Sequence, residues 1–137
     1  GARQMRLDKA LETLDKAISL IPEVGFYEQK AKVLAELGKT EEAKALVPEI
    51  LTMIEEDITG GHIMDLELAA VQLELAQDYE SALAAAQKAE EKRPENLEVQ
   101  KMMARIYAAK GDQGLTQAYA KKAQRTGWKA PDLVELL

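Results

Sequence analysis

The stretch LELAAVQLELAQDYESALAAAQKAEEKRP, residues 66–94, decides the fold. Most of its residues are Ala, Leu, Glu, Lys or Gln, which are good helix formers. Apolar side chains recur three or four positions apart on both sides of Asp78, as they do along one face of a helix. Asp78 is a helix-capping residue type, and Pro94 cannot continue a helix. The stretch therefore predicts two helices, at about residues 63–76 and 79–92, joined by a tight turn.

Caps and helix breakers divide the rest of the chain in the same way. Each segment is bounded by a proline, a glycine or a capping residue, and each carries apolar residues three or four positions apart. No stretch shows the alternating pattern of a strand, so the sequence predicts an all-α fold. A loop is expected at residues 58–62. The remaining predicted helices cover about residues 4–20, 24–37, 40–56, 96–110 and 113–126, with a short terminal helix at 131–137.

Two features mark the predicted helix at residues 40–56. Thr40 is expected to cap its N-terminus, and Glu41 and Glu42 follow in the first turn, where negative charge is favourable. Pro48 lies inside the segment. Because an interior proline deletes a backbone hydrogen bond and crowds the preceding turn, we expect a kink there or a break into two shorter helices.

Composition and charge exclude several classes of protein. The chain of 137 residues has no cysteine, which excludes a disulfide framework, a thiolate zinc site and a cysteine nucleophile. No apolar run approaches the length of a membrane span, so no membrane insertion is expected. The net charge is −6, and an acidic protein is poorly suited to neutralise phosphates, so no nucleic-acid partner is expected. The chain is expected to be soluble, in the cytoplasm or the periplasm.

The helix pairs repeat in sequence. In the unit that ends at Pro94, a large residue, a small pair and a larger apolar residue precede a series of spaced alanines. These residues are Leu66, Ala69, Ala70, Leu73, Ala82, Ala86 and Ala89. The same order recurs downstream at Met103, Ala104, Tyr107, Gly111 and Ala120, and upstream at Lys30, Ala31, Leu34, Gly38 and Ala43. The first helix supplies the second half of an earlier unit, with Ala10, Leu14, Ala17 and Pro22.

The period of this repeat can be checked from the prolines. Pro22 and Pro94 lie 72 residues apart, which equals two units of about 34 residues plus four more. The four extra residues fit the loop that contains Gly60 and Gly61. Small residues at fixed positions are expected to let neighbouring helices approach closely, at Ala70, Ala82, Ala86, Ala89, Ala104 and Ala120.

This pattern resembles the tetratricopeptide repeat (TPR) family over nearly the whole chain. The resemblance implies one domain over residues 1–137, built as a right-handed αα superhelix of about three helix pairs. A half repeat would precede these pairs and a short C-terminal helix would follow them. The implied bounds are a half repeat at 1–23, repeats at about 24–57, 63–96 and 97–130, and the terminal helix at 131–137.

The first helix of such an array lacks its partner. We expect that the chain is cut from a longer protein. The alternative is that the open face of this helix meets another chain.

The resemblance also places one face of each pair's first helix in a concave groove. In the repeat at 63–96 that face is wholly apolar and surplus to the packing face; we call it the apolar stripe, which consists of Met64, Leu68, Val71 and Leu75. One interpretation is that inter-repeat packing or the chain's own C-terminus covers the stripe, through Leu133, Val134, Leu136 and Leu137. Another is an open groove for a partner helix or an extended peptide. A dimer contact is the third.

Two cations accompany the stripe. Lys101 and Arg105 are one turn apart on the predicted helix 96–110 and would face the same groove. They are either two solvated cations or a clamp for an acidic segment or a C-terminal carboxylate. The candidate partner-binding residues are therefore Met64, Leu68, Val71, Leu75, Lys101 and Arg105.

No set of residues in the sequence predicts a catalytic centre, a metal site or a cofactor. His62 is the only histidine, and it lies in a glycine-rich loop without a second imidazole or a thiol. The leading hypothesis is a non-catalytic interaction module that binds a protein or peptide, apolar or acidic in character, in its concave groove. The alternative is a structural or assembly element that mediates self-association into a homo-oligomer, or docking within a larger multidomain protein.

Overall fold

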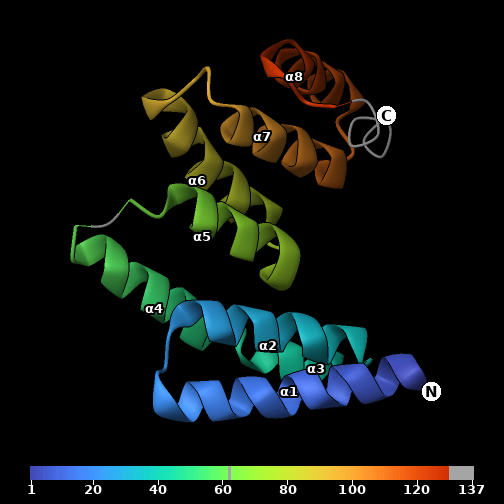
Figure 1. The fold of residues 1–137 in the computed structure, drawn as a ribbon. Coiled ribbons are helices and arrows are strands. Elements are labelled where there is room, and N and C mark those ends of the chain that lie inside the picture. The colour runs from blue at the N-terminus through green and yellow to red at the C-terminus, as the bar shows by residue number, and fades with distance from the viewer. Residues whose placement is uncertain (62, 130–137) are drawn as a thin grey trace. The chain divides into compact units, whose positions relative to one another are not determined.

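The computed structural model describes residues 1–61 and 63–129 (Figure 1). All regular secondary structure in these ranges is helical, which confirms the predicted all-α class there. The predicted terminal helix at 131–137 and His62 lie outside the described residues. The helices are α1 (Ala2–Leu20), α2 (Val24–Glu36), α3 (Thr40–Ala45), α4 (Val47–Thr59), α5 (Asp65–Val71), the π-helix η1 (Gln72–Ala76), α6 (Tyr79–Lys92), α7 (Leu97–Lys110) and α8 (Gln113–Thr126). None of the helices in the described part is long and apolar enough to span a membrane.

The chain forms two compact units, Gly1–Ile63 and Met64–Leu137, which we call unit 1 and unit 2. The boundary directly follows the loop that contains Gly60 and Gly61. Within unit 1, α2 packs against α1, α3 and α4. Within unit 2, α6 packs between α5 and α7, and α7 packs against α8. The sequential helices are therefore paired within each unit, as the short turns predict.

The break expected at Pro48 is present. Helix α3 ends at Ala45, and α4 begins at Val47, so Pro48 lies in the first turn of a new helix. Proline is tolerated in that turn because its missing N–H would have had no partner within the helix. The predicted loop at 58–62 begins later than expected, since α4 continues to Thr59.

The expected capping role of Thr40 is wrong. Thr40 is already the first helical residue of α3, Lys39 is the N-cap, and no side chain in the described ranges caps this helix. The cause is the end of α2, where Gly38 adopts φ +80° and the Lys39 amide donates to the Leu34 carbonyl oxygen at 2.8 Å. Lys39 is therefore the last residue before α3, and the next helix begins at Thr40.

The predicted helix at 63–76 starts later and ends differently. Its first helical residue is Asp65, and from Gln72 the backbone widens into the π-helix η1. Gln77 then adopts φ 54°, and it is the one non-glycine residue of the described chain with positive φ. The amides of Gln77 and Asp78 both donate to the Gln72 carbonyl oxygen, the latter at 2.9 Å. Periodicity in the sequence carries no signal for this local widening.

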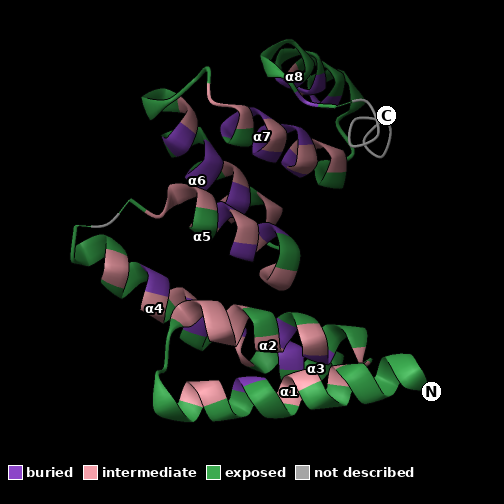
Figure 2. Ribbon diagram, viewed as in Figure 1, coloured by how far each residue is buried: buried purple, intermediate pink, exposed green. Residues whose placement is uncertain are grey.

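Small residues line the helix contacts of unit 2, as expected. Ala82, Ala86 and Ala89 of α6 are fully buried against α5 and α7, and Figure 2 shows buried residues along these helices. On α5 the fully buried small residue is Ala69, whereas Ala70 is only partly buried. The expected register of the small pair is therefore displaced by one residue. Unit 1 has its own core, formed by Ala31, Leu34, Ile50 and Ile54 with exposures of 0–3%.

The predicted cap at Asp78 is confirmed and makes the stability of α6 depend on pH. Its carboxylate accepts from the Ser81 hydroxyl at 2.7 Å and from the Ser81 amide at 3.1 Å. The hydroxyl contact first, and then the amide contact, lower the pKa of Asp78 below its usual 3.8. Because the pKa is depressed in the folded state, this stabilisation is present above pH 3.8 and is lost as the pH falls through the folded pKa.

Asp78→Asn tests this dependence, because asparagine still caps the helix but does not titrate. We expect the wild type to be more stable than the variant at neutral pH, and this difference to disappear well below pH 3.8. Urea midpoints at the two pH values measure it. Ser81→Ala removes the hydroxyl contact but keeps Asp78. We expect its stability at neutral pH to lie closer to that of Asp78→Asn than the wild type does. An Asp78→Asn variant whose midpoint follows pH as the wild type does would contradict the assignment.

Candidate functional site

All six residues predicted to bind a partner lie in unit 2. Met64 is the N-cap of α5, Leu68 and Val71 belong to α5, and Leu75 belongs to η1. Lys101 and Arg105 are on α7, which contacts α5. The predicted residues therefore come from neighbouring elements of one unit, separated by about 30 positions in the sequence.

The apolar stripe is only partly open. Val71 is 2% exposed, whereas Met64, Leu68 and Leu75 keep an intermediate exposure. Leu68 also packs against the core of unit 2. The C-terminal leucines and valine that were expected as one cover of the stripe lie outside the described residues. Of the four residues, Met64 and Leu75 combine partial exposure with a position at the two ends of the stripe.

Both predicted cations have partners inside unit 2. The Arg105 guanidinium Nη2 lies 2.6 Å from Glu74 Oε1, and the two side chains are 40% and 30% exposed. Lys101 Nζ lies 5.6 Å from the centroid of the Trp128 ring and 3.7 Å from Glu98 Oε1. Partly exposed ion pairs are worth only about 0–1 kcal/mol. An acidic partner could therefore exchange with Glu74 at a small cost.

Glu74, which pairs with Arg105 of α7, lies in the π-helix. Glu74 is the central residue of η1, and Arg105 lies on the neighbouring helix 31 positions later in the chain. Because η1 has a wider turn than an α-helix, residues after Gln72 are rotated relative to a regular continuation of α5. The Glu74–Arg105 pair therefore joins a segment whose geometry the regular helical period does not predict.

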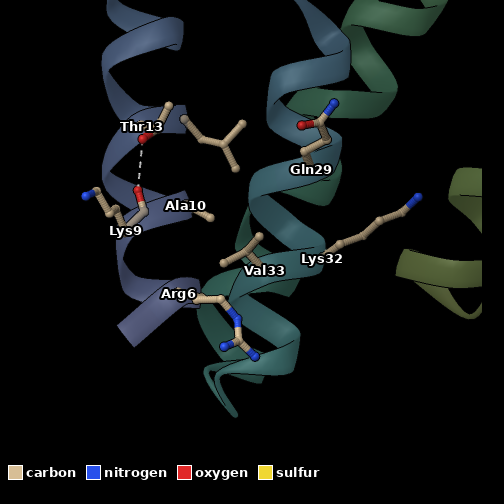
Figure 3. A pocket seen from close by; sticks show the side chains of 8 residues that line it. Arg6, Lys9, Ala10, Thr13, Gln29, Lys32 and Val33 are labelled. Atoms are coloured by element: carbon tan, nitrogen blue, oxygen red, sulfur yellow. Dashed lines mark hydrogen bonds between the residues drawn. The ribbon is translucent and has the colours of Figure 1, made fainter. Parts of the chain in front are cut away.

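A groove that the sequence interpretation missed lies between α1 and α2 of unit 1 (Figure 3). Its volume is about 650 Å³, and most of its lining surface is apolar. Figure 3 shows Ala10 and Val33 between the two helices, with Lys9 and Lys32 extending to opposite sides. We call it the α1–α2 groove, which is lined by Arg6, Lys9, Ala10, Thr13, Leu14, Gln29, Lys32 and Val33.

The sequence contained part of the signal for this groove. Pro22 and the spaced alanines predicted that α1 is the second half of a repeat without its first half. The missing step was the register of α1 against α2. That register places Leu14 of α1, which is 9% exposed, and the exposed Gln29 of α2 in one groove.

Two smaller hollows have a different character. One, of about 500 Å³, lies between the α1–α2 turn and α4 and carries Glu23, Glu56 and Asp57. The other, of about 330 Å³, lies where α6, α7 and α8 meet and includes the buried Gln100. Gln100 Nε2 donates to the Pro94 carbonyl oxygen at 3.3 Å, and its Oε1 accepts no hydrogen bond from the described residues. Within the described ranges, no group of three or more His, Asp or Glu residues could hold a metal ion.

The resemblance to the TPR family rests on the sequence pattern alone. A search of protein-family models and a search of curated proteins each found no match to the chain.

Proposed function

We propose that the chain is a non-catalytic interaction module of TPR-type helix pairs, stacked as a right-handed αα superhelix. Its partner is a protein or peptide that binds on the face of unit 2 carrying the apolar stripe, Lys101 and Arg105. The observation that supports this proposal most directly is the two-sided apolar character of one helical segment. Ala69 and Leu73 are buried on its inner side, while Leu68 and Leu75 remain partly exposed. Partly exposed apolar residues beside exchangeable charges are typical of a contact surface.

The chemistry of this face favours a partner with apolar anchors and a nearby carboxylate. Met64 and Leu75 offer apolar contacts at the two ends of the stripe. Arg105 is already paired with Glu74 in unit 2, so a partner carboxylate would bind by replacing a contact of the same type. Such an exchange contributes more to orientation and specificity than to affinity. An amphipathic helix or an extended peptide fits this description.

The proposal is tested by capturing a partner from lysate of the source cells with the wild-type chain and with Leu75→Glu. We expect the wild type to capture a defined protein, and the variant to capture at least about tenfold less, because a charge then occupies an apolar contact. Leu115→Glu is the matched control, since Leu115 is an exposed leucine of α8 outside the stripe. Circular dichroism confirms that both variants are folded. Equal capture by wild type and Leu75→Glu, or no capture by the wild type, would remove the support for this surface.

A structural or assembly role is the second candidate, and unit 1 provides the observation that favours it. Three large apolar side chains of α1 and the residue after it are unusually exposed. They are Met5 at 72%, Leu20 at 81% and Ile21 at 55%. Sedimentation over a range of concentrations separates the two roles. A mass that rises with concentration, and that Leu20→Glu returns to that of the monomer, would favour assembly. A constant monomer mass would exclude self-association.

A further inference from the structure

The helix pair α1 and α2, which forms the α1–α2 groove, can be compared with the pair α6 and α7 of the same chain. Adding 72 to the residue numbers of α1 superimposes its sequence on α6, so that Pro22 matches Pro94 and Leu11 matches Leu83. Adding 73 to those of α2 superimposes it on α7. Ala31 then matches Ala104, and both have no exposed surface. The glycines that end the two helices, Gly38 and Gly111, adopt the same φ of +80° and +81°. Helices α1 and α2 are thus the counterparts of α6 and α7.

In unit 2 this pair of helices is covered by α5, which contacts both α6 and α7. The covered residues belong to one core with Ala69 and Leu73 of the α5 segment, and they are Ala82, Ala85, Ala86, Met102 and Ile106. Their exposures range from 0% to 8%. Their counterparts in unit 1 are Ala10, Thr13, Leu14, Gln29 and Val33. All five line the α1–α2 groove. The groove is therefore the part of α1 and α2 that corresponds to the surface under α5.

The exposure of these counterparts shows that the groove is open in the described structure. Thr13 and Gln29 are exposed, and Ala10 and Val33 keep intermediate exposure. The matching residues Ala85, Met102, Ala82 and Ile106 are all buried. A helix of the size of α5 lying in the groove would bury these positions to the same extent.

The charges around the groove specify what kind of helix fits. The α5 segment carries two carboxylates that bind its neighbours: Asp65 Oδ2 lies 2.9 Å from Lys92 Nζ, and Glu74 Oε1 lies 2.6 Å from Arg105. Lys32 is the counterpart of Arg105 and lines the groove. The described lining residues include three cations, Arg6, Lys9 and Lys32, and no carboxylate. An occupant with carboxylates beside its apolar face would complement this surface.

At its N-terminal end, α1 differs from its counterpart α6. In unit 2, the chain turns from η1 into α6 at Gln77, which adopts φ 54°. The counterpart of that turn in unit 1 lies within residues 2–6, which are helical and continuous with the rest of α1. A covering helix joined to α1 by the same turn would require this part of α1 to unwind.

We propose that the α1–α2 groove binds an acidic amphipathic helix of a partner protein, in the position that α5 has on α6 and α7. The apolar side of the helix would contact Ala10, Leu14 and Val33, and its carboxylates would lie beside Arg6, Lys9 and Lys32. This surface belongs to unit 1 and is separate from the face of unit 2 proposed above. The two proposals can therefore fail independently.

The probe that tests this proposal is a helix-constrained, fluorescently labelled peptide with the sequence of residues 64–77, MDLELAAVQLELAQ. It carries the same apolar side and carboxylates that cover the corresponding surface in unit 2. We expect saturable binding to the full chain by fluorescence anisotropy. The charge reversal Arg6→Glu with Lys9→Glu should weaken binding by about tenfold, as for the loss of favourable contacts at a partly exposed rim. A peptide with its carboxylates converted to amides should also bind more weakly.

Two controls locate the site. Lys88→Glu with Lys121→Glu reverses two exposed cations outside the groove and should leave the affinity unchanged. Thr13→Trp fills the groove from an exposed position and should abolish binding while the chain stays folded. Leu75→Glu, which disrupts the proposed surface of unit 2, should have no effect on the peptide.

Three results would overturn the proposal. The first is the absence of saturable binding to the folded wild type. The second is binding that survives both the rim reversal and Thr13→Trp, which would place the peptide elsewhere. The third is a wild-type chain that self-associates in sedimentation and becomes monomeric with Thr13→Trp, which would make a second copy of this chain the occupant.

Discussion

Replacing Trp128 with alanine is expected to lower the free energy of unfolding of unit 2 by about 3–5 kcal/mol, the largest loss among the substitutions considered for this protein. Trp128 is 6% exposed and packs against Ala104, Ala120 and Ala123 at the contact between α7 and α8. These buried neighbours are alanines with almost no exposed surface, and their side chains are too short to extend into the space that the indole leaves. The cavity would remain largely empty, which adds to the loss of buried apolar area.

Urea unfolding followed by far-ultraviolet circular dichroism measures this change. Trp128→Phe is the matched control, because it keeps an aromatic ring in the same place and is expected to lose much less. The indole Nε1 donates to no acceptor among the described residues, so phenylalanine removes no hydrogen bond there. In the wild type, the fluorescence of this single tryptophan should shift to longer wavelength on unfolding. An alanine variant as stable as the phenylalanine variant would show that the ring does not fill the α7–α8 contact.

Replacing Ile54 with alanine is expected to cost about 2–5 kcal/mol in unit 1. Ile54 and Ile50 lie one turn apart on α4, and both have no exposed surface. Helix α4 packs against α2, where Ala31 and Leu34 are equally well covered. Since the chain forms two compact units, each with its own core, the loss is expected to appear first in the helices of unit 1.

Hydrogen exchange measured by mass spectrometry resolves this effect by segment. Amides of α2 and α4 should exchange faster in Ile54→Ala than in the wild type. Ile58→Ala is the control on the same helix, because Ile58 is 38% exposed and its truncation should stay within about 0.5 kcal/mol. If both variants exchanged alike, Ile54 would not be part of a tight core.

Most helices could be predicted from the sequence because their signals are local. The bounds of α6 and α8 agree with the prediction, since Asp78 and Asp112 each accept a hydrogen bond from the amide three residues ahead. The break at Pro48 follows from the geometry of the proline ring. Thr40 and η1 were not predicted correctly, because the start of α3 depends on how α2 ends. The widening at Gln72 has no signal in the apolar periodicity of the sequence.

The candidate site was predictable only as a set of positions on helices. Helical spacing places Lys101 and Arg105 one turn apart, and it places Leu68 and Leu75 on one side of their segment. Spacing cannot reveal that Arg105 pairs with Glu74, nor that Lys101 lies over the ring of Trp128. These contacts join residues about 30 positions apart and depend on how far each helix slides and rotates on its neighbour.

The sequence by itself determined which segments of the described chain are helices and where most of them end. Capping, proline and glycine act within a few residues, so these features do not require knowledge of the rest of the chain. Only the tertiary structure decided the exposed part of the apolar stripe, the partners of the two cations and the open groove between α1 and α2. Those features arise from side-chain packing between helices, where a shift of one residue changes which atoms meet.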